Sequence, residues 1–328
     1  MQGWVREEGH CSTGAAGVDV SKHELVVAPA GASAVMRFSN DTAGHGELCR
    51  RMSKAQRQDG PLRVGLEASG GYERKIAAAL RKAGLEVIVF QPAQVRAYAH
   101  YLGQRAKTDP IDARLIALCT AARQGRARQV DKRIAQLAEH LTYIEQIEED
   151  IARLKTRLDG FAAGRFKSLI EADIKRLKQR RAAAIRALVK ALREHPDLGR
   201  RLDLVAGIDG IGERTALALL IRMPELGSMT REQAASLAGL APFDVQSGKA
   251  DRIRHIQGGR TRVRRSIYAA ALPAAFNWNV AIIDLYQRLM ARGKNHKRAL
   301  VACARKLVIY ANAVLQRGTP WTKTIPNQ

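Results

Sequence analysis

The sequence predicts an α/β domain followed by an all-helical remainder. Short β-branched runs alternate with helical stretches between Gly17 and about Gln124, as expected for a mixed sheet packed against helices. Apolar residues then recur every three or four positions from Ile134 to Leu192, which is typical of long amphipathic helices. The rest of the chain is helical and increasingly basic. Because 328 residues exceed one ordinary domain, we expect an N-terminal tail (1–14), an α/β domain (15–128), a helical hairpin (129–200) and a basic C-terminal domain (201–328).

The α/β domain begins with three strands and continues with alternating helices and strands, an order that favours a mixed sheet. We expect its strands at 17–20, 23–28, 35–38, 63–66 and 86–90, and its helices at 44–56, 72–83, 92–101 and 110–123.

The apolar seam predicts a coiled-coil-like helical hairpin. Its first arm covers 134–158 with charged residues between the apolar positions, and the stretch 160–164 interrupts it. The second arm ends at His195-Pro196. We expect this hairpin to separate the two domains. A long apolar seam flanked by charges is also an efficient dimerisation surface, so we expect a homo-oligomer.

The net charge of +24 predicts strong attraction to a polyanion, and nucleic acid is the leading partner. An anionic membrane surface is the alternative. However, no apolar run approaches the roughly 20 residues of a transmembrane helix, and the first residues carry no apolar signal segment. The four cysteines are scattered without zinc or disulfide spacing. We therefore expect a cytoplasmic protein without a membrane partner.

Four acidic residues of the α/β domain are candidate catalytic metal ligands. Asp19 lies within an apolar strand, where a carboxylate is costly unless it faces a partner, and Glu67 ends a second strand. Asp109 and Asp112 share one face of a helix start. Convergent carboxylates suit Mg²⁺, and two such ions could clamp the attacking and leaving oxygens of a phosphodiester. The local alternative is an ordinary helix start, with Asp109 as N-cap and Asp112 in the first turn.

A glycine-rich turn, 207–212, directly precedes an apolar helix. Such a turn can aim backbone N–H groups at a phosphate, so Gly210, Gly212 and Arg214 are candidate nucleic-acid contacts. The segment resembles the helix-hairpin-helix motif of DNA-binding proteins that do not read sequence. A simple packing turn is the alternative.

Ser247 lies in a Pro/Gly loop between helices, beside Gly248 and Lys249. A serine in such a loop can attack phosphorus if a base or a metal activates it. Most loop serines are solvated or cap helices, so the residues alone favour the ordinary role.

Basic residues accumulate after Ser247 and are opposed in that stretch by only Asp251 and Asp284. This imbalance predicts contacts with phosphate backbones, whereas a merely solvated charged face would intersperse acids. The candidate nucleic-acid contacts are Lys249, Arg260, Arg262, Arg264, Arg265, Lys294, Lys297 and Arg298.

These segments, in this order, resemble the DEDD-type insertion-sequence transposases of the IS110 family, which also includes Piv-like DNA invertases. The resemblance covers nearly the whole chain, from Gly17 to Trp321, and rests on the motifs GVDVSK, GLEASGGYE, KTDPIDARLIA, GIDGIGERTA, GLAPFDVQSGK, IQGGRTRVRRSIY and GKNHKRALVACARKL. Two positions depart from it: Ala68-Ser69 replaces the usual Ala-Thr, and the usual Asn-Pro is missing near Asn277.

The resemblance implies a RuvC-like N-terminal domain of RNase H fold whose tetrad is Asp19, Glu67, Asp109 and Asp112, with Mg²⁺ as cofactor. It also implies that Ser247 is the nucleophile of a C-terminal transposase domain. Family members are understood to recombine donor and target DNA through a phosphoserine link, as tetramers, and many are guided by a structured bridge RNA.

Two other functions remain possible from the residues themselves. The same tetrad could serve a junction-resolving nuclease that uses water as nucleophile and needs no Ser247. Alternatively, the charge alone could belong to a non-catalytic nucleic-acid-binding protein, for which the tetrad would be dispensable.

Overall fold

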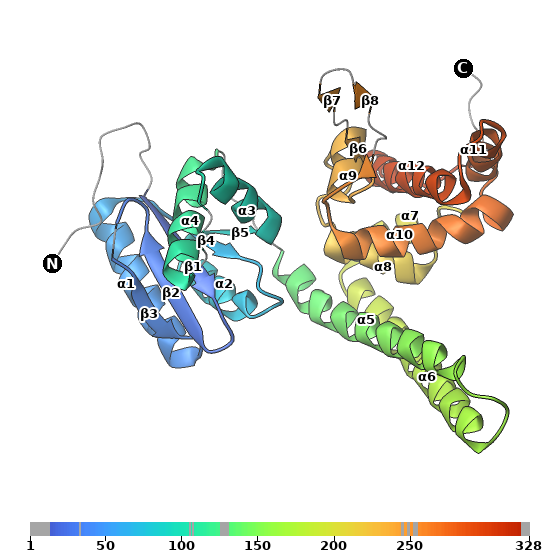
Figure 1. The fold of residues 1–328 in the computed structure, drawn as a ribbon, viewed down its shortest axis with the longest axis horizontal. Helices are drawn as coiled ribbons and strands as arrows, with labels where there is room; N and C mark the ends of the chain where they lie inside the picture. Colours follow the sequence, from blue (N-terminus) through green and yellow to red (C-terminus); the bar gives the residue numbers. More distant parts are fainter. Residues whose placement is uncertain are drawn as a thin grey trace. The chain divides into compact units, whose positions relative to one another are not determined.

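The computed structural model describes residues 14–32, 34–104, 106, 108–124, 131–243, 246–247, 250–251 and 255–322. The chain forms two compact units, Met1–Gln129 and Val130–Gln328 (Figure 1). The expected tail, 1–14, lies almost entirely outside the described residues.

The first unit is built on one mixed sheet of five strands in the order β3-β2-β1-β4-β5. The strands β1 (Gly14–Val20), β2 (Glu24–Pro29) and β3 (Met36–Ser39) pair antiparallel, whereas β4 (Leu62–Glu67) pairs parallel with β1 and β5 (Glu86–Phe90). This arrangement confirms the predicted α/β domain with a mixed sheet.

Helices cover both faces of this sheet. On one face, α1 (Thr42–Asp59) and α2 (Glu73–Lys82) pack with Val18, Val64 and Val87 in one hydrophobic core. On the other, α3 (Pro92–Tyr101) and α4 (Asp109–Ala122) pack against Ile88 and Phe90 of β5. Successive side chains of a strand point to opposite faces of the sheet. Neighbouring residues of one strand therefore contact different pairs of helices.

The second unit is helical and begins with an antiparallel pair, α5 (Lys132–Leu158) and α6 (Arg165–Arg193) (Figure 1). In the described residues there follow the α-helices α7 (Pro196–Ala206), α8 (Glu213–Arg222), α9 (Arg231–Leu237) and α10 (Thr261–Pro273), a π-helical turn η1 (Ala274–Trp278), and the α-helices α11 (Val280–Ala291) and α12 (His296–Arg317). The predicted hairpin is therefore present as two packed helices.

The apolar seam of the hairpin is buried within the chain itself. Near its base, Leu141 and Ile144 share one core with Leu188 and with helices α7 to α12. Further out, Ile147, Ile151 and Ile174 form a separate small cluster. The seam that we considered for dimerisation is thus used for packing inside this unit.

Helix α12 is long and apolar enough to cross a membrane by length and composition, but half of its most apolar window is buried in the fold. Its residues Leu300, Leu307 and Val308 are fully or almost fully buried in the core of the second unit. Its hydropathy is accounted for by this packing.

Candidate functional site

Asp19 and Glu67 lie side by side at the carboxyl ends of two adjacent parallel strands. The register of β1 and β4 pairs Val18 with Leu66, one position before each acid. Because Val18 and Leu66 face the core formed with α1 and α2, both acids face the opposite side, which α4 covers. The sheet therefore brings these two predicted ligands together.

Two glycines allow α4 to lie directly on this part of the sheet. A Cβ on Gly17 would stand 2.1 Å from the carbonyl oxygen of Ala113, and a Cβ on Gly65 would stand 1.9 Å from the Thr120 hydroxyl oxygen. Each glycine precedes an acid by two residues and shares its face of the sheet. The pattern Gly-x-Asp and Gly-x-Glu therefore sets the close approach of helix and carboxylates.

Asp109 and Asp112 lie in the first turn of α4. The N-cap is Thr108 rather than Asp109, so the capping role considered from the sequence is wrong at this position. The backbone N–H of Asp112 donates to the Thr108 carbonyl over 2.8 Å, which starts the helix. Both acids are thus held on a regular helix that packs against β1 and β4.

The four acids form one electrostatic group centred on Asp19. The pKa of Asp19 is raised from 3.8 to about 6, mainly by burial and then, in decreasing order, by the charges of Asp112, Asp109 and Glu67. In the described ranges, no three His, Cys, Asp or Glu side chains are arranged as a ready-made metal site. The donor set consists only of carboxylates, which suits a hard divalent cation that keeps positions open for phosphate oxygens.

Glu73 shapes the turn that follows Glu67, a role the sequence reading missed. Glu73 is buried, and its carboxylate accepts hydrogen bonds from the backbone N–H groups of Ser69 (3.0 Å) and Gly71 (2.8 Å). Gly70 and Gly71 both have positive φ, which explains the glycine pair. In the sequence, this role was indicated by an acid, Glu73, two residues after the glycine pair.

Ser247 lies in a short β-ribbon and not in a plain loop. The strand β7 (Gln246–Ser247) pairs with β8 (Ala250–Asp251), and β6 (Pro242–Phe243) pairs with β9 (His255–Ile256). The Ser247 side chain and the whole of Lys249 lie outside the described residues. Their predicted roles stay predictions.

Comparison with known proteins identifies the chain. A DEDD-type IS110 transposase model matches residues 16–166, and a model described as Transposase IS116/IS110/IS902 family matches residues 202–287. The chain belongs to the IS110 family of transposases. It is a DNA transposase or recombinase, and DEDD transposases generally depend on divalent metal ions.

Three relatives agree with this assignment. The pilin gene-inverting proteins of Moraxella bovis and Moraxella lacunata are each 28% identical over 293 residues, which is 88% of this chain and 90% of theirs. An insertion element IS110 protein of 43.6 kDa from Streptomyces coelicolor is 35% identical over 153 residues, 45% of this chain and 36% of its own length.

The glycine turn of the transposase is a packing turn at Gly210. Gly210 has a φ of 92°, and a Cβ there would lie 2.4 Å from the Ala274 Cβ, so the turn fits against η1. Asn279 donates to the Asp209 carbonyl over 3.0 Å and fastens the same contact. Gly212 is the N-cap of α8, and a Cβ there would meet nothing within 4 Å. Gly212 is therefore the better placed of the two for a phosphate.

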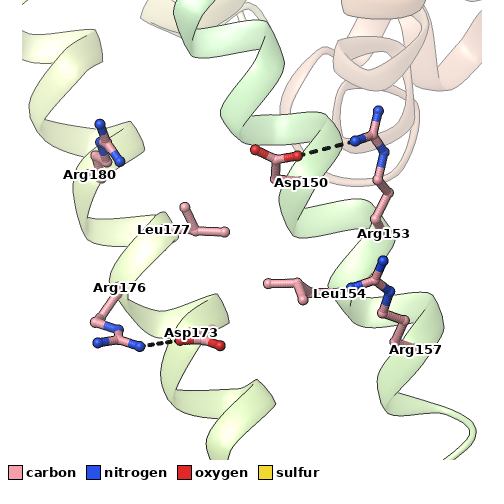
Figure 2. A pocket seen from close by; sticks show the side chains of 8 residues that line it. All are labelled: Asp150, Arg153, Leu154, Arg157, Asp173, Arg176, Leu177 and Arg180. Carbon is pink, nitrogen blue, oxygen red and sulfur yellow. Dashed lines mark hydrogen bonds and ion pairs between the residues drawn. The ribbon is translucent and has the colours of Figure 1, made fainter.

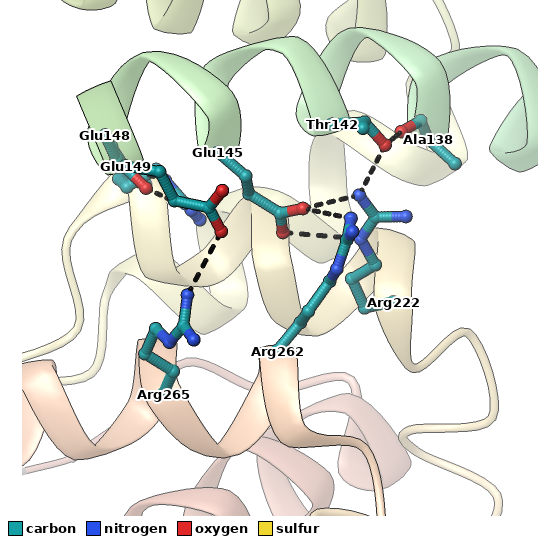
Figure 3. A network of polar contacts seen from close by, with 9 residues as sticks. Ala138, Thr142, Glu145, Glu148, Glu149, Arg222, Arg262 and Arg265 are labelled. Atoms are coloured by element: carbon teal, nitrogen blue, oxygen red, sulfur yellow. Dashed lines mark hydrogen bonds and ion pairs between the residues drawn. The ribbon is translucent and has the colours of Figure 1, made fainter. Parts of the chain in front are cut away.

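Most predicted arginine contacts are paired inside the second unit. Glu145 of α5 accepts from Arg222 (2.8 Å) and from Arg262 (2.7 Å), as Figure 3 shows. Glu149 of α5 pairs with Arg265 over 3.4 Å. The acids that neutralise this basic stretch lie far away in the sequence, which is why local charge counting overlooked them.

Other predicted contacts are also paired within the second unit. Glu148 of α5 pairs with Arg214 over 2.7 Å, and Glu225 pairs with Arg260 over 2.6 Å. Arg264 donates to the carbonyl oxygens of Gly239 and Gly258. These side chains hold helices together, so any phosphate contact by Arg214 or Arg260 would compete with a carboxylate.

Three predicted contacts remain exposed around the start of α12. Lys294, Lys297 and Arg298 are all exposed, and no ion pair to them occurs within the described part of the chain. The N-terminal end of a helix adds a favourable dipole for an anion. This cluster is better suited to a phosphate backbone than the paired arginines of α10.

The hairpin adds a basic surface that the sequence reading missed. Helix α6 carries ten Lys and Arg residues against Glu171 and Asp173. Near the outer end of the hairpin, a groove of about 500 Å³ lies between the two helices, with Leu154 and Leu177 facing each other across it (Figure 2). It is lined by four arginines, Arg153 and Arg157 of α5 and Arg176 and Arg180 of α6. Asp150 and Asp173 pair with Arg153 and Arg176. The composition of this helix was the available signal.

Proposed function

We propose that this transposase cuts and rejoins DNA by transesterification, using Ser247 as nucleophile and Asp19, Glu67, Asp109 and Asp112 to hold Mg²⁺. The observation that carries the proposal is that Asp19 and Glu67 end two adjacent parallel strands on the face covered by α4, whose first turn holds Asp109 and Asp112. Carboxylates forced together without a cation repel one another, so their arrangement is explained by a bound divalent ion. When bound, Mg²⁺ would stabilise charge on the phosphate oxygens.

In the proposed step, the Ser247 hydroxyl oxygen attacks the scissile phosphorus and forms a P–O bond as the bond to a deoxyribose oxygen breaks. The serine proton passes to a base or to water, and the leaving oxygen takes up a proton. Rejoining reverses these events with a deoxyribose hydroxyl from another strand. The phosphoester is conserved throughout, which water as nucleophile would not allow.

We further propose that donor and target DNA are selected by a structured bridge RNA and that the transposase acts as a homo-oligomer, with dimers assembling into tetramers. The net charge of +24 and the exposed basic residues at the start of α12, Lys294, Lys297 and Arg298, support binding of polyanions. The relatives named for inverting a pilin gene support recombination over simple degradation.

The experiment is to incubate the transposase with DNA carrying the ends of its own element, its bridge RNA and Mg²⁺, and to resolve the products under denaturing conditions. We expect protein covalently attached to a cut DNA end. Ser247→Ala should abolish this adduct, whereas Ser228→Ala, an exposed serine of the same unit, should leave it unchanged.

A hydrolytic nuclease is the second candidate because all four carboxylates belong to the first unit, which does not contain Ser247. If Ser247→Ala cuts DNA at the normal rate and no adduct forms with either protein, water is the nucleophile and the serine assignment fails.

A further inference from the structure

A cavity of about 880 Å³ lies in the second unit between α11, α12 and the segment that follows α12. Its apolar floor includes Ala281, Leu285 and Val314. The start of this segment is held to α7, because Arg200 donates to the Gly318 carbonyl over 3.2 Å. The cavity is large enough for a nucleotide-sized ligand, and the proposed catalytic chemistry uses none of its residues.

Aromatic rings line this cavity. Tyr310 of α12 and Trp321 of the following segment have ring centroids 4.4 Å apart, so the two rings pack against each other. Trp278 also lines the cavity and has 63% of its surface exposed. An exposed tryptophan next to a cavity is typical of a binding surface, since its large apolar area gains from being covered.

The position of Trp278 is set by an unusual backbone feature. It ends the π-helical turn η1, and the chain then bends by 96° into α11. Asn279 fixes this bend because it is 2% exposed, caps α11 through the Ile282 N–H and donates to the Asp209 carbonyl. π-Helical turns occur frequently at functional sites, and this one presents a tryptophan at the wall of a cavity.

Cations surround the aromatic rings. The cavity is lined by three exposed basic residues, Arg288, Lys306 and Arg317, and by two acids, Asp209 and Asp284. The Lys306 ammonium lies 5.3 Å from the centre of the Tyr310 ring. The combination of stackable rings and a net positive rim is that of proteins that bind single-stranded nucleic acid.

We propose that this cavity binds an unpaired nucleotide of a single-stranded nucleic acid. The base of this nucleotide stacks on Trp278 or on the Tyr310–Trp321 pair. The phosphates of the strand next to it pair with Arg288, Lys306 and Arg317. The ligand is a DNA strand opened during recombination or a single-stranded part of an RNA. The proposal does not depend on Ser247 or on the carboxylates, so it holds equally for a hydrolytic enzyme.

A second copy of the chain is the competing occupant, because Leu272, Phe276 and Val280 near Trp278 also expose apolar surface. The positive rim favours a polyanion over a copy of a chain whose own charge is +24.

Fluorescence tests the proposal directly. The chain has three tryptophans, of which Trp278 and Trp321 line the cavity, so Trp4→Phe leaves both reporters at the site. We expect short oligo(dT) or oligo(rU) to quench this protein, and Trp278→Ala to weaken single-strand binding about tenfold in Kd. Duplex DNA binding should change less than twofold. Phe166→Ala, an equally exposed aromatic on α6, is the matched control.

The outcomes separate the alternatives. Quenching by oligo(dT) alone identifies a DNA strand, and quenching by oligo(rU) alone identifies RNA. The proposal is overturned if neither oligonucleotide quenches the fluorescence, or if Trp278→Ala weakens the binding of duplex and single strands equally. It is also overturned if Trp278→Ala changes the sedimentation of the protein without changing its binding of nucleic acid. Thermal melting checks that each variant is folded, and cutting of DNA by the Ser247→Ala protein remains a separate measurement.

Discussion

At the scale of single residues, the charged form of Asp19 that would bind a metal ion is also the form that burial disfavours. Its pKa of about 6 in the fold, against 3.8 for an ordinary aspartate, means that the folded protein binds this proton more tightly than the unfolded chain. The associated stabilisation is therefore complete below about pH 4 and is lost as the pH rises through 6. At neutral pH the charged carboxylate destabilises the metal-free protein.

Asp19→Asn should consequently stabilise the metal-free transposase at pH 7.5 by about 1 to 2 kcal/mol, after allowance for partial exposure of the site. At pH 4 the two proteins should melt alike, since a protonated aspartate resembles asparagine. Calorimetry with EDTA at both pH values measures the difference. Mg²⁺ should raise the melting temperature of the wild type only, and an equal rise in the variant would contradict the metal assignment.

At the scale of elements, the close contact of α4 with the sheet depends on Gly17. We predict that Gly17→Ala lowers the free energy of unfolding by about 1 to 3 kcal/mol through overpacking and weakens Mg²⁺ binding, because α4 carries Asp109 and Asp112. Gly46→Ala is the control: a Cβ there meets nothing within 4 Å, and the helix should gain up to about 1 kcal/mol. Equal effects of the two substitutions would rule out the packing explanation.

The contact of α5 with α8 and α10 depends on Glu145, whose side chain is only 13% exposed and whose partner Arg222 is 14% exposed. Glu145→Ala should cost about 2 kcal/mol, because it leaves a largely buried guanidinium without its carboxylate. Asp150→Ala, on the same helix but in an exposed pair with Arg153, should cost at most about 0.5 kcal/mol. Urea unfolding of the second unit measures both, and similar costs would show that the Glu145 network is merely a surface feature.

At the scale of the whole molecule, the carboxylates and Ser247 belong to different units. Recombination needs at least two coordinated cleavages, so we predict that the carboxylates of one subunit act with Ser247 of another. Mixing Asp109→Asn protein with Ser247→Ala protein should then restore part of the activity, because some assemblies contain one intact composite site. Adduct formation is the readout. If mixtures assemble on DNA but stay inactive, each subunit carries its own complete centre.

The sequence by itself determined the order of elements and the identity of the acids. Strand β5 and helix α3 have the bounds expected from periodicity and turn residues, because alternation and proline act over a few positions. Asp19 and Glu67 were recognisable because a carboxylate inside or at the end of an apolar strand is costly without a partner.

Only the tertiary structure decided which charges are free. Arg262 and Arg265 looked unopposed within their own stretch, yet Glu145 and Glu149 reach them from α5. Likewise, the hairpin seam that could have joined two copies is filled by the second unit's own helices. Charge and burial depend on neighbours in space, and a chain brings together residues more than a hundred positions apart that no local pattern connects.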